Sequence, residues 1–354
     1  MSKVKVLLIG AAFSADLHAE GYARATDIAE IVAICDKDVS RIDELANRYG
    51  FKDYAVYDDM FKAIDEVECD VVDICLPNFL HVEAAKRAFA KGRHVISEKP
   101  LATTVEDAKA MVDAAEAAGK KLYYAEDWLF APALGRALAV IEEGAIGKPM
   151  FVRARECHNG SHSPFTKTIK FCGGGSMVHL GVHPVCFMLA LKNNRWTELV
   201  AMTSDGGEAN LWHRDMEGED WGAVLIKFED GTRALLEANY VTCGGMEDVI
   251  DFYGDKGCVH VDLTMSSAVS VYSEPGLSYT VEKADVTTGW SKPAVDEKFN
   301  LGYVGEIRHF IESARDNKDA KVGLRGIDGY EALRVINLIY KSAKEGVAIK
   351  NDLL

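Results

Sequence analysis

Residues 71–101, VVDICLPNFLHVEAAKRAFAKGRHVISEKPL, read as a buried strand, a helix and a second buried strand. The first strand ends at Pro77-Asn78 and the second at Glu98-Lys99. Short apolar runs without alternation are typical of parallel strands that are covered on both faces. Open α/β sheets bind their ligands at the carboxyl ends of such strands, so the two breaks predict a binding edge.

Strands and helices alternate through residues 1–124. This alternation is typical of a doubly wound parallel (Rossmann) sheet, and we expect residues 1–124 to form a dinucleotide-binding domain of the α/β class. A capping box, Thr103 with Glu106, opens the helix after the second strand, and Gly119 closes it. The other strands are expected at Val4–Ile9, Ile31–Cys35, Tyr54–Val56 and Lys121–Ala125, and the other helices at His18–Ala25, Val39–Tyr49 and Met60–Val67.

The pattern changes after residue 125, where a helix at Pro132–Glu143 precedes strand-like runs. Turns such as Phe228–Thr232 and Gly254–Gly257 are hairpin signals. Residues 125–354 are therefore expected to form an α+β domain for substrate binding and oligomerisation, with a large, mostly antiparallel open sheet. The runs are Met150–Glu156, Glu198–Ser204, Ala223–Phe228, Arg233–Tyr240, Asp248–Tyr253, Gly257–Val261 and Ala268–Tyr272, and helices return at Val304–Asn317 and Asp328–Glu345.

Composition narrows the class of protein. The chain has 354 residues, of which 48% are hydrophobic, and a net charge of −15. Such an acidic chain is expected to bind neither nucleic acid nor an anionic membrane, and no run of about 20 apolar residues predicts a membrane span. The eight cysteines form no CxxC pair and the N-terminus begins a strand without a signal peptide, so we expect a cytoplasmic protein with buried thiols.

The turn Gly10-Ala11-Ala12-Phe13-Ser14-Ala15 follows a strand and opens a helix. A dinucleotide fingerprint reads GxGxxG or GxGxxA, in which glycines allow the backbone to approach the pyrophosphate. Gly10 and Ala15 fit this pattern, whereas Ala12 stands where the second glycine is usual. The motif favours dinucleotide binding, and a βα turn without a ligand is the alternative.

Asp36 ends the second strand, 26 residues after Gly10. A carboxylate there accepts hydrogen bonds from the adenosine ribose and repels a 2′-phosphate, which favours NAD over NADP. Lys37 weakens that discrimination, and an exposed Asp at a strand end is the alternative.

Three residues near the binding edge have two interpretations each. Asn78 caps the following helix or bonds the cofactor near its nicotinamide end. His81, on the first turn of that helix, is a structural residue or a cofactor contact. Trp128, at the domain junction, packs in a core or stacks on the nicotinamide or a sugar ring.

The segment Cys172–Pro184, CGGGSMVHLGVHP, combines three glycines with two histidines. His179 and His183 are four residues apart and are expected to share one helical face. Neutral imidazole is a competent general base, so a catalytic base is the leading interpretation. The same spacing suits a metal with a third ligand from Glu156, His158 or His162, and a structural pair is the third possibility. We expect no metal.

Taken together, the glycine turn, Asp36, PNFLH, EKPLATT, EGAIGKP and GGG…H…H resemble the Gfo/Idh/MocA family from end to end. The resemblance implies an NAD(P)-dependent oxidoreductase of sugars or polyols. The runs ECHNGSHSPF and AEDWLFAP look closest to members that oxidise glycosides at ring carbon 3. The family places the Lys of EKP and an Asp and His four apart around the substrate carbon, which here are Lys99, His179 and His183. His179 thus stands where the family has Asp.

The resemblance implies reversible hydride transfer between a glycoside hydroxyl and NAD, in a homo-oligomer. His183 is expected to remove the proton, Lys99 to bond the same oxygen, and His179 to orient either. Glycoside cleavage by oxidation and elimination, a catalytically silent NAD-binding regulator and a metal-dependent hydrolase are the alternatives. Cofactor contacts are expected from Gly10, Ala12, Phe13, Ser14, Asp36, Lys37, Pro77, Asn78, His81, Glu98, Lys99 and Trp128, and substrate contacts from Glu156, His158, His162, Lys99, His179 and His183.

Overall fold

The computed structural model describes residues 2–161, 163–264, 267–277 and 287–351. The chain forms two compact units. The first contains Met1–Phe130 and Gly302–Leu333, and the second contains Ala131–Leu301 and Arg334–Leu354. The domain boundary expected after residue 124 stays a prediction, and the structure adds that a C-terminal segment returns to the N-terminal unit.

The first unit is built on a parallel sheet of six strands in the order β3-β2-β1-β4-β5-β6. Helices follow the strands in turn, which confirms the predicted Rossmann-type class. The order reverses between β1 and β4, where a doubly wound sheet opens its binding crevice. The elements are β1 Val4–Ile9, α1 Phe13–Ala23, β2 Ala29–Cys35, α2 Val39–Tyr49, β3 Ala55–Tyr57, α3 Met60–Glu66, β4 Val71–Ile74, η1 Asn78–Leu80, α4 His81–Ala90, β5 His94–Glu98, α5 Val105–Ala118, β6 Leu122–Ala125, η2 Asp127–Phe130 and α11 Tyr303–Arg315.

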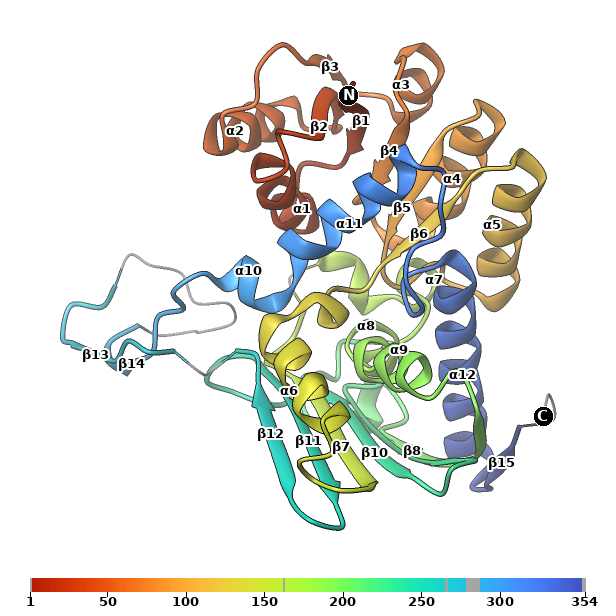
Figure 1. The fold of residues 1–354 in the computed structure, drawn as a ribbon, viewed down its shortest axis with the longest axis vertical. Coiled ribbons are helices and arrows are strands. Elements are labelled where there is room, and N and C mark those ends of the chain that lie inside the picture. The colour runs from red at the N-terminus through yellow and green to blue at the C-terminus, as the bar shows by residue number, and fades with distance from the viewer. Residues whose placement is uncertain (1, 162, 265–266, 278–286, 352–354) are drawn as a thin grey trace. The chain divides into compact units, whose positions relative to one another are not determined.

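The C-terminal helix α11 lies beside α1, although almost 300 residues separate them in sequence (Figure 1). Gly21 makes the close approach possible, because a Cβ at this position would lie 2.6 Å from Cβ of Ile307. Ile307, Phe310 and Ile311 are fully buried in the core of this unit. The return of α11 thus covers α1 and completes the apolar core.

The second unit holds a seven-stranded sheet in the order β12-β11-β7-β10-β9-β8-β15. Only β7 and β10 run parallel, and the other neighbours are antiparallel, as predicted for most of the sheet. Helices α8 and α9 pack on one face of it. The elements are α6 Pro132–Glu142, β7 Pro149–Cys157, η3 Pro164–Lys167, α7 Ile169–Cys172, α8 Ser176–His179, α9 Val182–Leu191, β8 Trp196–Thr203, η4 Gly207–Ala209, β9 Trp221–Phe228, β10 Arg233–Asn239, β11 Glu247–Gly254, β12 Cys258–Asp262, β13 Val271–Ser273, β14 Gly289–Ser291, α10 Glu297–Leu301 and β15 Ile349–Lys350. The helix α12 Gly326–Glu345 begins in the first unit and ends in the second.

Among the described residues, no single helix has the length and hydropathy of a membrane span. The bent pair Ile169–His179 and Val182–Leu191 meets that test only when its two parts are counted together, and they meet at an angle of 58°.

Candidate functional site

The glycine turn connects β1 to α1. Gly10 has a φ of +108°, and a Cβ there would lie 2.2 Å from the carbonyl oxygen of Cys75. Ala12, the N-cap of α1, makes no side-chain bond to the first turn at Phe13 and Ser14. A helix start that lacks a side-chain cap and follows a close-packed glycine fits the pyrophosphate of a dinucleotide.

Asp36 stands at the end of β2 and faces the same turn. Its Oδ2 accepts a hydrogen bond from the N–H of Ala11 at 2.8 Å, and its Oδ1 accepts one from the N–H of Asp38 at 2.9 Å. A carboxylate has further acceptor sites, so this geometry also suits a ribose hydroxyl. Lys37 is exposed beside it. A hollow of about 160 Å³ adjoins the turn and is lined by Ala11, Ala12, Phe13, Asp16, Arg41, Glu44, Leu45 and Arg48.

The turn after β4 carries Pro77, Asn78 and His81. Asn78 begins the short helix η1, and His81 begins α4 with a fully buried ring. The N-cap of α4 is Leu80, so the interpretation of Asn78 as its cap is wrong, and its contact with the cofactor stays a prediction. Nε2 of His81 lies 2.8 Å from the carbonyl oxygen of Leu76, and Nδ1 lies 3.1 Å from that of Pro100. Burial lowers the pKa of His81, so the neutral ring donates through one nitrogen, and we assign the proton to Nε2. These two hydrogen bonds give His81 a structural role, which is one of its two interpretations from the sequence. A contact between His81 and the cofactor stays a prediction.

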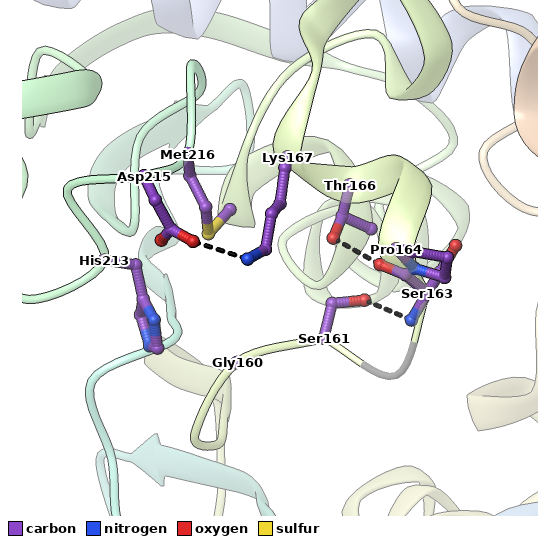
Figure 2. A pocket seen from close by; sticks show the side chains of 9 residues that line it. All are labelled: Gly160, Ser161, Ser163, Pro164, Thr166, Lys167, His213, Asp215 and Met216. Carbon is purple, nitrogen blue, oxygen red and sulfur yellow. Dashed lines mark hydrogen bonds and ion pairs between the residues drawn. The ribbon is translucent and has the colours of Figure 1, made fainter.

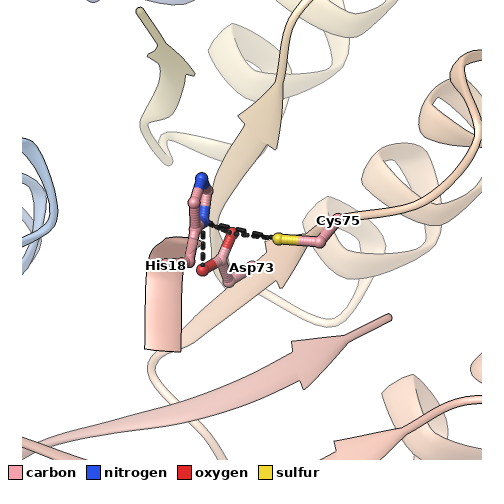
Figure 3. A group of neighbouring side chains, drawn as sticks. All are labelled: His18, Asp73 and Cys75. Carbon is pink, nitrogen blue, oxygen red and sulfur yellow. Dashed lines mark hydrogen bonds and ion pairs between the residues drawn. The ribbon is translucent and has the colours of Figure 1, made fainter. Parts of the chain in front are cut away.

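His18 on α1 forms a buried polar network with Asp73 and Cys75 at the end of β4 (Figure 3), and with Glu98 at the end of β5. Its Nδ1 lies 2.9 Å from Oδ2 of Asp73, and its Nε2 lies 3.2 Å from Oε1 of Glu98, without the alignment of a strong hydrogen bond. The Tyr22 hydroxyl donates to Asp73 at 2.7 Å. Burial alone would lower the pKa of His18, but the adjacent charge of Asp73 raises it well above its usual value. His18 is therefore an imidazolium between two carboxylates.

The trio of His18, Asp73 and Cys75 offers donor atoms of the kinds that bind metals. Metal binding requires a neutral imidazole and a thiolate. Burial raises the pKa of Cys75 to about 12, and the pKa of His18 is raised as well. Both residues hold their protons at neutral pH, so a hydrogen-bonded network explains the trio better than a metal centre.

The network reaches the predicted catalytic lysine through Glu98. Oε2 of Glu98 accepts a hydrogen bond from the backbone N–H of Lys99 at 2.9 Å. Burial would raise the pKa of Glu98, but the hydrogen bond and charge of His18 outweigh it and lower that pKa. An ionised Glu98 thus fixes the main chain from which the half-buried Lys99 projects. Trp128 is buried in η2.

Two further acids are buried in the first unit. Burial raises the pKa of Glu126 to about 8, against the opposing charge of Lys99. Burial raises the pKa of Glu306, on α11, well above its usual value, and its carboxyl oxygens accept no hydrogen bond from the described residues. A protonated Glu306 is therefore expected near neutral pH.

In the second unit, the glycine triplet packs against Glu219. A Cβ at Gly175 would lie 1.9 Å from the carbonyl oxygen of Glu219, so only glycine fits. The Glu219 carboxylate accepts bonds from the N–H groups of Gly175 at 3.0 Å and Met177 at 2.8 Å, and from the Tyr340 hydroxyl at 2.9 Å. Glu219 therefore caps α8, the short helix that ends at His179.

The two predicted active-site histidines lie on different helices. The chain breaks at Leu180-Gly181 between α8 and α9, so the shared helical face expected from the sequence is wrong. Gly181 bonds back to the carbonyl of Ser176, five residues earlier, and a Cβ on it would lie 2.8 Å from the Met177 carbonyl oxygen. This wider, π-type turn ends α8 and places the second histidine on a separate helix.

Each histidine has its own partner. Nδ1 of His179 lies 2.9 Å from the Tyr240 hydroxyl, and Nε2 of His183 lies 3.6 Å from Oε2 of Glu156 at the end of β7. The His158 ring packs 5.3 Å from that of Tyr240. The second unit thus brings together His179, His158 and Tyr240, and separately His183 and Glu156. His162 lies outside the described residues.

Lys99 belongs to the first unit, and His179 and His183 belong to the second. Their convergence on one substrate carbon stays a prediction. Sequence reasoning missed His18, Asp73, Glu219 and Tyr240. The only available signal was a polar residue inside an apolar run, such as Asp73 in VVDIC or Tyr240 in ANYV.

Comparison with known proteins identifies relatives along the whole chain. The model described as the oxidoreductase family with an NAD-binding Rossmann fold (GFO_IDH_MocA) matches residues 4–126. The model of the GFO/IDH/MocA C-terminal domain matches residues 135–260.

Among curated proteins, D-glucoside 3-dehydrogenase of Escherichia coli K12 is 35% identical, and the match covers 99% of this chain and 98% of that protein. D-apiose dehydrogenase of Paraburkholderia graminis is 26% identical, with 99% and 90% covered. Among solved structures, GenD2 from gentamicin A biosynthesis in complex with NAD has a TM-score of 0.88 at 23% identity, with 99% and 97% covered.

Proposed function

Because this chain belongs to the Gfo/Idh/MocA family of NAD-binding sugar and polyol dehydrogenases, we propose that it oxidises a glycoside at ring carbon 3, with NAD. The observation that carries this proposal is the polar cluster of the second unit, where His183 lies 3.6 Å from Glu156 and His179 bonds Tyr240. Alcohol oxidation needs a general base that takes the hydroxyl proton, and a carboxylate beside an imidazole base stabilises its protonated form.

His183 takes the proton of the reacting hydroxyl. Glu156 stabilises the imidazolium that forms, as a carboxylate beside a catalytic histidine does. The Lys99 ammonium donates a hydrogen bond to the same oxygen and stabilises its developing negative charge. NAD, when bound, accepts the hydride.

The remaining polar groups orient the sugar. His179 and His158 bind neighbouring ring hydroxyls, and Tyr240 fixes the ring of His179. The buried network of His18, Asp73 and Glu98 fixes the backbone of Lys99 through a hydrogen bond to its N–H. The fixed backbone in turn limits the positions that the Lys99 amine can reach. Placement of this kind is worth several orders of magnitude in rate when the reacting groups are aligned.

The substrate class follows from the relatives' names and from the departure at His179. The relative with the highest listed identity is named a D-glucoside 3-dehydrogenase, which supports a glucoside and ring carbon 3. An imidazole at the position of the family's usual Asp adds no fixed negative charge, which suits a neutral sugar.

The test uses purified protein, NAD and a panel of methyl glucoside, free glucose and an inositol. Absorbance at about 340 nm reports turnover, and NMR of the product identifies the oxidised carbon. A 3-keto glycoside with stoichiometric NADH supports the proposal. A ketone at another carbon contradicts the ring position, and free sugar without net reduction indicates oxidation and elimination.

Two finer features belong to the same proposal. The coenzyme is NAD in preference to NADP, because the Asp36 carboxylate faces the glycine turn. The protein is a homo-oligomer, because the sheet of the second unit exposes Val200, Met202 and Leu225 on the face opposite α8 and α9.

A further inference from the structure

A hollow of about 320 Å³ lies between two loops of the second unit (Figure 2). One loop follows β7, and the other connects β8 to β9. Figure 2 shows His213 and Asp215 on one loop across from Ser161 and Ser163 on the other. None of the lining side chains takes part in the chemistry proposed above. The walls combine hydroxyl groups, an ion pair between Lys167 and Asp215, and the side chains of Pro164 and Met216.

Both loops are anchored to one backbone carbonyl. The oxygen of Tyr240 accepts a bond from Nε2 of His213 at 2.7 Å and one from the N–H of Gly160 at 3.2 Å. The fully buried Asp220 accepts bonds from the N–H groups of Leu211, Trp212 and His213 at 2.7 to 3.1 Å. The 211–213 turn is therefore built by buried hydrogen bonds and holds its side chains in place.

This turn presents two large apolar side chains to solvent. Leu211 is 63% exposed and Trp212 is 57% exposed. The hydrophobic effect opposes such exposure, and exposed aromatic side chains on a rigid turn are typical of binding surfaces. The Trp212 indole stacks on His213, with ring centroids 6.3 Å apart and planes 20° apart.

A chain of side-chain contacts connects the wall of the hollow to His179 in the proposed active site. The His213 ring meets the Tyr240 ring edge-on at 6.4 Å, and the Tyr240 hydroxyl lies 2.9 Å from Nδ1 of His179. The Ser161 hydroxyl bonds the same phenol. Tyr240 is fully buried, so these contacts place the hollow close to His179 without offering the Tyr240 ring itself to a ligand.

We propose that this hollow and Trp212 form an aglycone subsite, which binds a neutral, ring-shaped, hydroxyl-bearing group on the anomeric carbon of the substrate. The inference rests on the proposed function, since it extends the site at His179. Sugar and phenol rings pack on aromatic faces and offer hydroxyls to polar side chains. The ion pair of Lys167 and Asp215 balances its own charge, which favours a neutral group over a phosphate. A volume of about 320 Å³ suits one ring, at the small end of ligand pockets.

The test compares methyl glucoside with cellobiose and a phenolic glucoside, using the full-length protein with NAD. We expect kcat/KM to be higher for cellobiose and the phenolic glucoside, whose aglycones are rings, than for methyl glucoside. Trp212→Ala should reduce the ratio of kcat/KM for cellobiose to that for methyl glucoside about three- to tenfold, through KM, which is the worth of one aromatic stacking contact. Trp290→Ala, which removes a tryptophan that is 76% exposed on β14, is the matched control and should leave the ratio unchanged.

A second variant keeps the test decisive if Trp212→Ala does not fold. Ser163→Tyr fills the hollow from its rim and should lower the same ratio. Ser163→Ala removes the same hydrogen bond to the N–H of Phe165 without filling the hollow, and it should leave the ratio unchanged. If glycosides are oxidised at carbon 3 and both Trp212→Ala and Ser163→Tyr leave the ratio within twofold, the subsite is overturned and the proposed function stands. If no glycoside is oxidised, the proposed function fails, and the subsite fails with it.

Discussion

Lys99 is placed by its main chain as well as by its side chain. The Glu98 carboxylate accepts a hydrogen bond from the backbone N–H of Lys99, and Nε2 of His18 lies 3.2 Å from the same carboxylate. An amine placed in this way stabilises charge on a substrate oxygen at little cost in reorganisation. We expect Lys99→Ala to lower kcat about 10²- to 10³-fold, because one preorganised donor to a developing anion is lost.

Binding of NAD to the Lys99→Ala protein, followed by calorimetry, should stay within about threefold of the wild type. Lys86→Ala, on the exposed side of α4, is the control for loss of a lysine. Turnover within tenfold of the wild type would refute the assigned role of Lys99.

We expect Asp36 to set the preference for NAD over NADP. Its carboxylate is fixed against the glycine turn, where a 2′-phosphate would meet its charge. Asp36→Asn should lower the ratio of kcat/KM for NAD to that for NADP by about tenfold or more, because a like-charge repulsion is removed. Asp43→Asn, on the exposed face of α2, removes the same charge away from the turn and should leave the ratio unchanged. An unchanged ratio in Asp36→Asn would assign the preference to other groups.

His18 makes stability depend on pH. Its folded-state pKa lies well above the usual 6.5. Its contribution to folding is therefore complete below pH 6.5 and is lost as pH rises through the raised folded value. His18→Gln leaves Asp73 and Glu98 without the buried cation, and it should lower the free energy of unfolding by about 3–5 kcal/mol at pH 6.

Urea unfolding at pH 6 and pH 9 measures this effect, and the difference between wild type and His18→Gln should shrink at pH 9. His94→Gln is the control. Burial lowers the pKa of His94 to about 4, so its folded ring is neutral at both pH values, whereas the unfolded ring is largely protonated at pH 6. The difference between wild type and His94→Gln should therefore grow slightly at pH 9, opposite in sign to the change for His18→Gln. A difference for His18→Gln that does not shrink at pH 9 would show that folding does not raise the pKa of His18.

At the scale of elements, the short helix α8 depends on one carboxylate. Glu219 satisfies the N–H groups of Gly175 and Met177, and burial raises its pKa to about 7. The unfolded chain ionises near 4.5, so wild-type stability falls as pH rises from 4.5 to 7. Glu219→Gln lacks this titration and should gain stability relative to wild type over that interval.

Glu219→Ala should unfold more easily than Glu219→Gln by about 1–3 kcal/mol at pH 8, because the alanine leaves the helix start without an acceptor. Glu208→Ala, in the same loop with a side chain that is 91% exposed, is the control. Equal stability of the two Glu219 variants, measured by urea unfolding, would show that the cap contributes nothing.

Local signals were enough to predict most elements. Gly119 closes α5 as the sequence predicts, and apolar runs located β1, β4 and β5. The predicted capping box of Thr103 with Glu106 is wrong by one residue, because the N-cap is Thr104, whose side chain accepts a hydrogen bond from the N–H of Asp107. These signals depend on backbone preferences and periodicity, which neighbouring residues decide.

The features that shape the site depend on partners far away in sequence. The break between α8 and α9 follows from the tight packing at Gly181, and the isolated pattern favours a continuous helix. His18 meets Asp73 across 55 residues, and His179 meets Tyr240 across 61. No local periodicity encodes such pairs, so the sequence indicated the two histidines and not their partners.

At the scale of the whole molecule, one face of the second unit's sheet has the composition of an interface. Val200 lies opposite Leu225, and Leu225 lies opposite Leu235, so the three form an apolar row across β8, β9 and β10. Val200 is 43% exposed and Leu225 is 50% exposed. The same row continues on β7 with Arg153, opposite Leu235, and on β11 with Asp251, and the ion pair of these two residues gives the apolar row a polar end.

A second copy of this chain is the expected cover for that row, since most oligomers of one chain are symmetric and use the same patch twice. The double variant Val200→Glu/Leu225→Glu sets like charges against each other in such an interface, where each buried unpaired charge costs several kcal/mol. Light scattering coupled to size exclusion should show an oligomer for the wild type and a monomer for the variant. Val347→Glu, at a side chain that is 45% exposed outside the row, should keep the wild-type mass. A monomeric wild type, or a double variant with unchanged mass, would rule out this face as the interface.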